Sequence, residues 1–392
     1  MQLISIERRD DAALTDVERA AIGRDAPDEV RRFLEPCPDY KPTPLASLPA
    51  LAAELGVGSV HIKDEGQRLG LLSFKALGGA YAVARLVHGM AEAALGEPVS
   101  PWTLQDEQVR KIASGLTVAC ATDGNHGRSV AAGARLFGCR CVIFLHEGVS
   151  QAREDAIAHF GAEIVRTAGT YDMSVAEAAR VAEREGWTVV SDTSWEGYHE
   201  IPWRVMQGYT VMIDEALDQL YAPPTHVFVQ GGVGGVAAAV SGHLLDRFGF
   251  ARPTMVVVEP SRANCLQASA IASALTAIEH GEATIMSMLE CYEPSEIAWS
   301  VLERSADLFL DVPEQAAIDA MRTLAHPHDG DPALVIGESG AAGLAGLTAV
   351  AGDPRMRERT GLDSSSHVLL FGTEGATDPE LYETLVGAAL NA

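Results

Sequence analysis

The stretch Ser73-Phe74-Lys75-Ala76-Leu77-Gly78-Gly79-Ala80-Tyr81 places one lysine at the head of an apolar, glycine-containing segment. Only four lysines occur in the 392 residues, and the charged residues nearest to Lys75 in sequence are Arg68 and Arg85. An apolar setting disfavours the ammonium and lowers the pKa of a lysine, as in lysines that attack carbonyl groups. A snorkelling lysine at the start of an amphipathic helix explains this stretch equally simply. Its meaning therefore depends on the rest of the chain.

Short apolar strands alternate with helical segments along most of the chain. Strands are expected at 59–63, 116–121, 140–145, 163–167, 187–191, 225–230, 254–258 and 367–371, with helices between most of them. Residues 262–350 are expected to form helices and loops only. This alternation predicts parallel sheets with crossover helices, arranged as two α/β layers of one molecule.

A glycine-rich loop follows one of these strands and precedes a helix. It has the sequence Gly231-Gly232-Val233-Gly234-Gly235. The backbone N–H groups of such a loop, together with a helix N-terminus, are suited to a phosphate. Two ligands fit: a single phosphate such as that of pyridoxal phosphate (PLP), or a dinucleotide whose ribose is held by Glu259. A tight turn without a ligand also stays open.

A second strand-to-helix turn has the sequence Thr122-Asp123-Gly124-Asn125-His126-Gly127. Its backbone N–H groups are suited to a carboxylate, and the Asn125 side chain is suited to a ring oxygen. A turn selected only for its asparagine and glycines explains the pattern equally well. Neither reading is favoured by this segment alone.

Two carboxylates, Asp123 and Asp192, stand at the ends of predicted strands. Ligands of parallel sheets bind at the carboxyl ends of the strands. A carboxylate partly withdrawn from water there can have the raised pKa of a general acid or base. A helix N-cap is the alternative role, and it is strongest for Asp192 because Thr193 and Ser194 follow it.

Composition limits the partners. The formal net charge is −25, so neither a nucleic acid nor a membrane surface is an expected partner. The sequence shows no transmembrane helix and no signal peptide, and a cytoplasmic protein is expected. The six cysteines form no Cys-x-x-Cys pair, and Cys265 and Cys291 are expected to be free thiols. The histidines of 326–331 are not spaced for a metal, and no metal site is expected.

Four segments occur in an order that resembles the fold-type-II PLP enzymes, which include the serine and threonine dehydratases and the tryptophan synthase β chain. These segments are 73–75, 123–127, 231–235 and 372–375. Within that group the chain resembles the diaminopropionate ammonia-lyase family, through 40–45, 63–65, 74–81, 122–128, 192–198, 206–209, 283–286, 337–341 and 373–378. Asp123 distinguishes the diaminopropionate ammonia-lyases from the dehydratases, because the dehydratases usually have Ser or Thr at that position. Ser73 departs from the pattern and is more similar to the dehydratases.

The resemblance implies a tryptophan synthase β-like α/β fold with two parallel-sheet domains, PLP as the cofactor, and a homodimer. It implies a large PLP-binding domain formed by 1–80 and 190–392, and a small mobile domain formed by 81–189. The implied reaction is the α,β-elimination of 2,3-diaminopropionate to pyruvate and ammonia. A carboxylate such as Asp123 can bind the cationic β-ammonium, whereas the alcohol of a hydroxyl amino acid offers no cation.

The resemblance also implies a role for each matching residue. Lys75 forms the Schiff base with PLP, and Asn125 and Thr373 contact the ring hydroxyl and the pyridine nitrogen. Asp123 and Asp192 act as bases near Cα, which supports the hypothesis that D and L substrates both react. The expected cofactor-binding residues are Phe74, Lys75, Asn125, Gly231, Gly232, Val233, Gly234, Gly235 and Thr373. The expected residues for the amino-acid substrate are Thr122, Asp123, Gly124, His126 and Asp192.

Three alternatives remain open from the sequence. A serine or threonine dehydratase is the nearest, because it shares the fold and most of the motifs. An NAD-dependent oxidoreductase would use the glycine-rich loop for a dinucleotide. A non-catalytic amino-acid-binding regulator would use the same cavity without chemistry.

Overall fold

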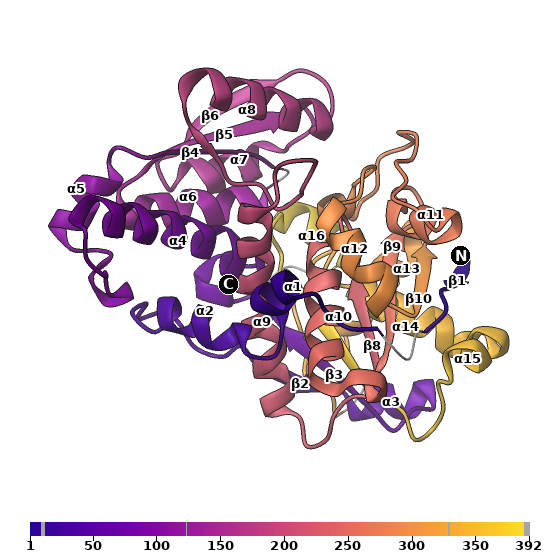
Figure 1. Cartoon of the computed structure of the whole chain (residues 1–392). Coiled ribbons are helices and arrows are strands. Elements are labelled where there is room, and N and C mark those ends of the chain that lie inside the picture. Colours follow the sequence, from indigo (N-terminus) through magenta and orange to yellow (C-terminus); the bar gives the residue numbers. More distant parts are fainter. Residues whose placement is uncertain (9–11, 123, 328–329, 388–392) are drawn as a thin grey trace.

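The computed structural model describes residues 1–8, 12–122, 124–327 and 330–387 (Figure 1). The strands are β1 Leu3–Ser5, β2 Leu45–Ser47, β3 Ser59–Asp64, β4 Thr117–Ala121, β5 Arg140–His146, β6 Glu163–Thr167, β7 Thr188–Val189, β8 His226–Gln230, β9 Thr254–Pro260, β10 Leu308–Val312 and β11 His367–Gly372. The helices are α1 Asp16–Ile22, α2 Ala26–Leu34, α3 Pro49–Leu55, α4 Lys75–Leu95, α5 Glu107–Ala113, α6 Asn125–Phe137, α7 Gln151–Ala158, α8 Tyr171–Glu185, α9 Glu200–Gln219, α10 Gly235–Phe248, α11 Cys265–Ala272, α12 Glu296–Ser305, α13 Glu314–Ala325, α14 Ala342–Gly352, α15 Pro354–Thr360 and α16 Pro379–Val386.

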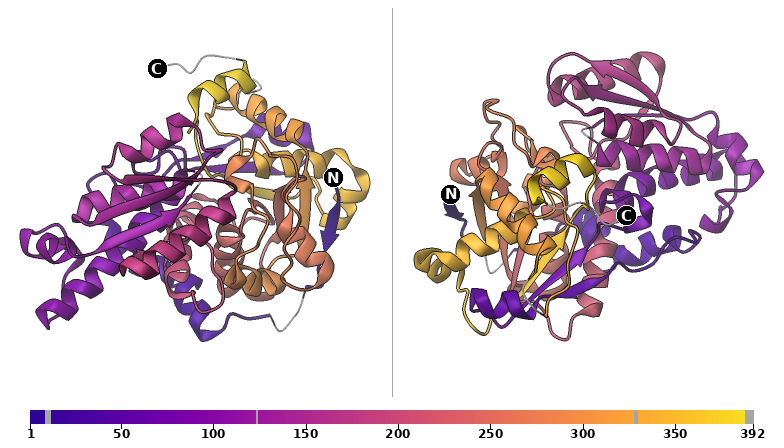
Figure 2. Two further views of the ribbon diagram at one scale, coloured as in Figure 1. Left: turned by 90° about the horizontal axis from the view of Figure 1, so that it is seen from above. Right: turned by 180° about the vertical axis from the view of Figure 1, so that it is seen from behind.

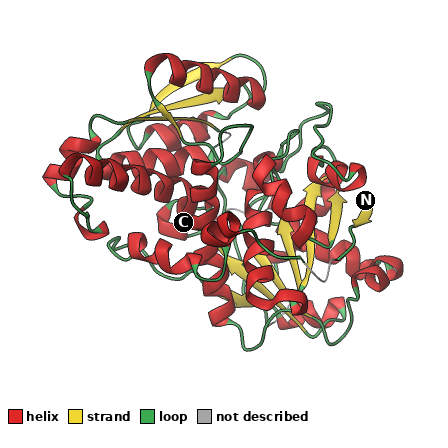
Figure 3. Ribbon diagram, viewed as in Figure 1, coloured by secondary structure: helices red, strands yellow, loops and turns green. Residues whose placement is uncertain are grey.

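The strands form two sheets with helices packed against them (Figure 3). The larger sheet has the order β1-β10-β9-β8-β11-β3-β2, and the smaller has the order β6-β5-β4-β7. Neighbouring strands are parallel, except that β1 and β2 join the edges of the larger sheet antiparallel. The smaller sheet lies at one end of the molecule and β1 near the other (Figure 2). The predicted α/β fold with two mainly parallel sheets is confirmed.

The larger sheet is buried on both faces, and the alternation of side chains along β8 shows this. Val227 and Val229 belong to a core that includes residues of α9, α10 and α12. Phe228, between them, belongs to a second core that includes residues of α13 and α14. Successive side chains of a strand point to opposite faces, so a strand covered on both sides is apolar throughout. In the described part of the chain, no helix is long and apolar enough to cross a membrane.

The structure corrects the prediction that 262–350 lacks a strand. β10 lies there, pairs with β9 and carries β1 at its outer edge. All five of its residues are buried, so it shows no alternation of apolar and polar side chains. A short apolar run of this kind cannot be distinguished from a buried piece of helix by periodicity. Its position was therefore not visible in the sequence.

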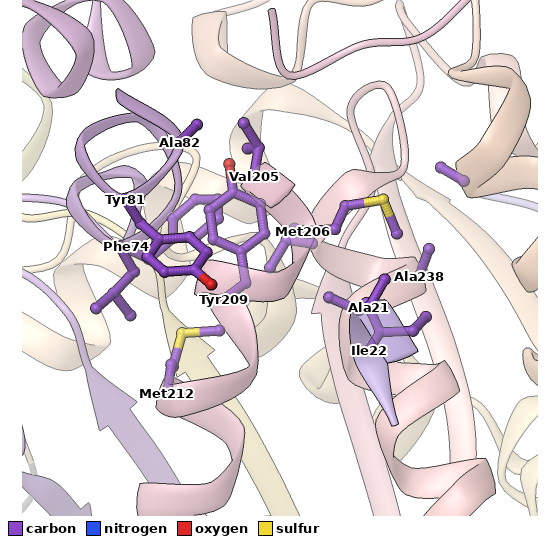
Figure 4. Packing of buried hydrophobic residues seen from close by; sticks show 14 of the residues in the cluster. Ala21, Ile22, Phe74, Tyr81, Ala82, Val205, Met206, Tyr209, Met212 and Ala238 are labelled. Carbon is purple, nitrogen blue, oxygen red and sulfur yellow. The ribbon is translucent and has the colours of Figure 1, made fainter. Parts of the chain in front are cut away.

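Helix α4 lies between α6 and α9, and glycines allow the backbones to approach closely (Figure 1). A Cβ on Gly133 of α6 would lie 2.9 Å from the Ala80 Cα of α4. A Cβ on Gly208 of α9 would lie 2.0 Å from the Leu77 carbonyl oxygen. Phe74, just before α4, packs against Tyr209 of α9 with ring centroids 4.7 Å apart (Figure 4). These contacts fix the position of the first turn of α4.

A buried ion network holds the segment that leads into α4. Arg68 donates to both oxygens of Glu65 and to both oxygens of Glu215 on α9, at 2.6–3.0 Å. Lys63 lies 2.9 Å from Glu215, and all four side chains are at most 3% exposed. Two cations and two anions balance here, which is the condition under which buried charges are tolerated. The network therefore ties the end of β3 to α9 just before Lys75.

We predict opposite effects for two glycine-to-alanine substitutions. Gly208→Ala should lower the free energy of unfolding by about 1–3 kcal/mol, because the new methyl group overlaps backbone that cannot move aside. Gly89→Ala in α4 should raise it by up to about 1 kcal/mol, because no atom lies within 4 Å of the new Cβ and alanine favours the helix. Urea unfolding of both variants measures this. A Gly208→Ala protein as stable as the parent would show that α4 and α9 are not in close contact.

Candidate active site

The carboxyl ends of three strands meet around one cavity. Thr122 follows β4, Gly231 follows β8 and Thr373 follows β11. The cavity encloses about 770 Å³ when the open solvent at its mouth is included. It is lined by Phe74, Lys75, Thr122, Asn125, His126, Tyr171, Asp192, Tyr209, Gln230, Gly231, Gly232, Val233, Gly235, Val236, Met288, Leu289, Cys291, Ser339, Thr373 and Glu374.

Most of the residues predicted for the site line this cavity. Gly234 lies within the glycine-rich loop, but its Cβ position faces Ala298 rather than the cavity, 3.0 Å from the Ala298 Cβ. Gly124 lies in the turn before α6, beside Arg153, and does not line the cavity. Asp123 lies outside the described residues.

Lys75, the first residue of α4, forms an ion pair in the cavity with Asp192. The Lys75 ammonium donates to Asp192 Oδ2, and the two side chains are 17% and 10% exposed. Burial is the largest single influence and acts to lower the pKa of Lys75, but the charge and hydrogen bond of Asp192, with contributions from Tyr209 and Cys291, together outweigh burial and raise the pKa. The expectation of a lowered lysine pKa is therefore wrong for this structure, because the pocket holds a carboxylate from a distant segment.

Asp192 is not a helix N-cap, because α9 begins only at Glu200. Burial acts to raise the pKa of its carboxyl, but the charges of His126, which is protonated at the low pH where this carboxyl titrates, and of the Lys75 ammonium together outweigh burial and hold the pKa below the usual range. The expectation of a raised pKa is therefore wrong as well. The carboxylate is ionised and held beside the lysine nitrogen.

His126, in the first turn of α6, is 4% exposed and directs one ring nitrogen to a backbone carbonyl. Its Nε2 lies 2.8 Å from the Val190 oxygen. Its Nδ1 lies 3.9 Å from Asp192 Oδ2 and has no hydrogen-bond partner. Burial lowers the pKa of His126. The imidazole is thus a neutral ring next to the ion pair.

A cluster of two buried glutamates stands beside Asn125 and was not found from the sequence. The Asn125 amide donates to Glu374 at 2.6 Å, and Glu374 also accepts from the Ser339 N–H at 3.2 Å. Arg153 donates to Glu338 at 3.1 Å. Burial, and then the Glu374 charge, raise the pKa of Glu338 to about 7. Glu374 immediately follows Thr373, which was predicted to be in the site, and this adjacency is the signal in the sequence that could have identified Glu374.

The glycine-rich loop joins β8 to α10. Gly232 and Gly234 have φ values of +65° and +101°, which side-chain-bearing residues rarely adopt. Glu259 does not face a ligand: its carboxylate accepts from the Leu266 N–H at 2.9 Å and the Gln267 N–H at 2.7 Å. It is fully buried, so it is not placed to hold a ribose, and this geometry disfavours the dinucleotide interpretation.

None of the six cysteines, all of which lie among the described residues, forms a disulfide, so Cys265 and Cys291 are not paired with each other. The Cys265 Sγ lies 3.7 Å from the Gly232 oxygen. Among the residues that the structure describes, no group of His, Cys, Asp and Glu is arranged to hold a metal. His328 and Asp329 of the 326–331 run lie outside the described residues.

The chain is similar to known proteins over most of its length. The family model for pyridoxal-phosphate dependent enzymes matches residues 37–373. Diaminopropionate ammonia-lyase of Escherichia coli K12 is 39% identical over 363 residues, covering 91% of this chain and 90% of that protein. A serine dehydratase-like protein of Rattus norvegicus is 27% identical over 208 residues, covering 50% of this chain and 61% of that protein.

Solved structures of the E. coli enzyme are also similar. Its complexes with an aminoacrylate–PLP azomethine reaction intermediate and with D-serine both have a TM-score of 0.88 and 35% identity. They cover 98% of this chain, and 96% and 97% of those chains. The fold and the family model together define a PLP-dependent enzyme of fold type II. Within that class, the chain belongs to the diaminopropionate ammonia-lyase family, and it is an ammonia-lyase.

The residues of the cavity fit PLP. The first turn of α10 leaves N–H groups without intrahelical partners, and such groups hold a phosphate. A Cβ on Gly235 would meet no protein atom closer than 3.6 Å, so packing does not require this glycine, and its backbone faces the cavity bare. Gln230 Oε1 and His126 Nδ1 are buried, lack a hydrogen-bond partner and belong to cavity-lining residues. The N–H groups suit an anionic phosphate, and the two acceptors suit ligand groups that donate hydrogen bonds.

We predict that Gly235→Ala weakens PLP binding on the order of tenfold or more without unfolding the protein. The methyl group would meet no protein atom closer than 3.6 Å, but it would occupy the space that a phosphate held at the start of α10 requires. Titration of the PLP-free protein with PLP, followed by absorbance, gives Kd. Gly89→Ala is the matched control and should keep the parental Kd. Unchanged binding by Gly235→Ala would place the phosphate elsewhere.

Proposed function

We propose that this chain eliminates the β-amino group of 2,3-diaminopropionate and yields pyruvate and ammonia, with Lys75 holding PLP and Asp123 and Asp192 acting as bases. One observation supports it most directly: the Lys75 ammonium and the Asp192 carboxylate meet in the cavity that the glycine-rich loop borders. The family to which the chain belongs supplies the reaction class. The D-serine complex of the E. coli enzyme supports an amino-acid substrate here.

PLP, when bound, supplies an electron sink that makes the Cα proton of an amino acid acidic. The chain supplies the remaining groups. Lys75 Nζ is the amine placed to hold the cofactor, and the backbone of 231–235 is placed for its phosphate. Asn125 and Thr373, which both line the cavity, are assigned to the ring hydroxyl and the pyridine nitrogen. Phe74 N–H donates to the Thr373 oxygen at 3.0 Å, which links the Thr373 position to the Lys75 segment.

The substrate is assigned to the turn that begins at Thr122. Thr122 Oγ1 accepts from the N–H groups of Gly124 and Gly127 at 3.0 Å each, and these bonds fix the shape of the turn. The start of α6 adds partly unsatisfied N–H groups, which favour a carboxylate. We therefore place the substrate carboxylate at this turn and its Cα toward Asp192.

Two wider features are proposed on the same basis. We propose that 81–189 moves as a small domain against 1–80 and 190–392; all four strands of the smaller sheet fall within it. We also propose a cytoplasmic homodimer.

The serine or threonine dehydratase alternative has weaker support, because the dehydratase-like relative matches only half of this chain.

Turnover tests the activity directly. The purified protein should be yellow, lose its visible band on treatment with borohydride, and release pyruvate and ammonia from diaminopropionate faster than from serine. Lysine modified by reduction should be found at Lys75 by peptide mass spectrometry. A protein that prefers serine would be a dehydratase, and a colourless protein that binds NAD would contradict the PLP assignment.

We predict that the two carboxylates act on different stereoisomers. Asp123→Asn and Asp192→Asn should each lower kcat for one isomer of diaminopropionate by about 100-fold or more while the other isomer is affected less, because each base reaches Cα from one side. Steady-state kinetics with D and L substrate measures this. Parallel loss of both activities in both variants would mean that the carboxylates act as one unit.

A further inference from the structure

The two ring nitrogens of His126 have different roles in the structure. Nε2 lies 2.8 Å from the Val190 carbonyl oxygen, and a carbonyl only accepts, so Nε2 carries the proton. In a neutral ring with that tautomer, Nδ1 is a bare acceptor. Nδ1 is buried without a hydrogen-bond partner, and His126 lines the active-site cavity.

The neutral form follows from the surroundings. His126 is 4% exposed, and burial lowers its pKa; Asp192 opposes this effect and the Lys75 charge adds to it. A carboxylate accepts hydrogen bonds and does not donate them, and Nδ1 in this tautomer has no proton to give. The His126 side chain is therefore not suited to the substrate carboxylate, although the turn that carries it is.

The group that Nδ1 can bind is one that donates. Asp192 Oδ2, also an acceptor, lies 3.9 Å from Nδ1, so both atoms line the same side of the cavity. An ammonium has three protons and can serve two acceptors at once. The structure already places one ammonium there, because Lys75 donates to Asp192 Oδ2. The pocket is thus built to receive a cationic nitrogen.

We propose that His126 Nδ1 accepts a hydrogen bond from the β-ammonium of the substrate and so selects an amine over a hydroxyl as the leaving group. This inference rests on the proposed function and names its specificity residue. Diaminopropionate carries such an ammonium on Cβ, whereas serine carries a hydroxyl at that position.

The chemistry explains the selection. The Cα proton passes to a base, and the electron pair of that C–H bond forms the Cα–Cβ double bond. The Cβ–N bond breaks with its electron pair going to nitrogen, so the β-ammonium leaves as neutral ammonia with its own three protons. An acceptor of low basicity binds the ammonium without removing a proton from it. A β-hydroxyl must gain a proton to leave as water, and His126 Nδ1 has none to supply.

The test compares substrates in the holoenzyme. His126→Gln keeps an N–H donor for Val190 but places no acceptor at Nδ1. The ratio of kcat/KM for diaminopropionate to that for serine should fall on the order of 10- to 100-fold, the loss expected for a hydrogen bond to a charged group. His243→Gln is the control, because His243 is also buried with one unpartnered nitrogen but does not line the cavity. It should leave the ratio unchanged.

Equal losses for both substrates, or an unchanged ratio, would overturn the proposal. A wild-type protein that does not convert diaminopropionate would instead overturn the proposed function. A second readout does not depend on turnover: ¹⁵N NMR of the wild-type holoenzyme should show His126 protonated at Nε2 and bare at Nδ1 between pH 7 and 9. A proton on Nδ1 in that range would contradict the inference, whether or not the variant folds.

Discussion

The close approach of α4 to α6 and α9 is the constraint on which the site depends. Gly133 meets Ala80 and Gly208 meets Leu77 at distances that leave no room for a side chain. Because protein interiors are as dense as organic crystals, helices in such contact cannot slide past one another, so the proposed movement of 81–189 would have to pivot about these contacts. α4 begins with Lys75 and α6 begins with Asn125, so fixing the two helices brings both side chains to one cavity. The position of both side chains in the site therefore depends on how closely α4 packs against α6 and α9.

The second constraint is the buried ion pair between Lys75 and Asp192. Lys75 and Asp192 are separated by more than 100 residues, yet they meet where little water reaches. In such a place a charge is tolerated when it is paired and hydrogen-bonded. A lysine nitrogen attacks a carbonyl only after it loses its proton, so if Lys75 holds PLP, as proposed, cofactor binding would have to break this pair. Asp192 would then lie beside the ring of His126 without its lysine partner.

The sequence predicted the elements whose signals are local. Apolar runs such as 225–230 gave strands, the glycine-rich loop gave the turn into α10, and a set of short motifs gave the family. β10 was missed because a fully buried strand has no alternation. The pKa of Lys75 was predicted in the wrong direction because its partner, Asp192, comes from a distant loop. The bond from Asn125 to Glu374 and the tautomer of His126, set by Val190, depend on tertiary contacts that no window of sequence contains.

The polarity of the cavity wall is divided in a way that matches a diamino acid. The starts of α6 and α10 present backbone N–H groups, which favour a carboxylate and a phosphate. Asp192 Oδ2 and His126 Nδ1 present acceptors on the side where Lys75 stands. A substrate with a carboxylate and two amines can bind both the backbone donors and the side-chain acceptors. If a hydroxyl replaces one amine, an acceptor receives only a hydrogen bond from a neutral group. Buried acceptors that lose a charged donor are costly, so under our proposal discrimination against hydroxyl amino acids would arise from acceptors left without a charged donor rather than from steric exclusion.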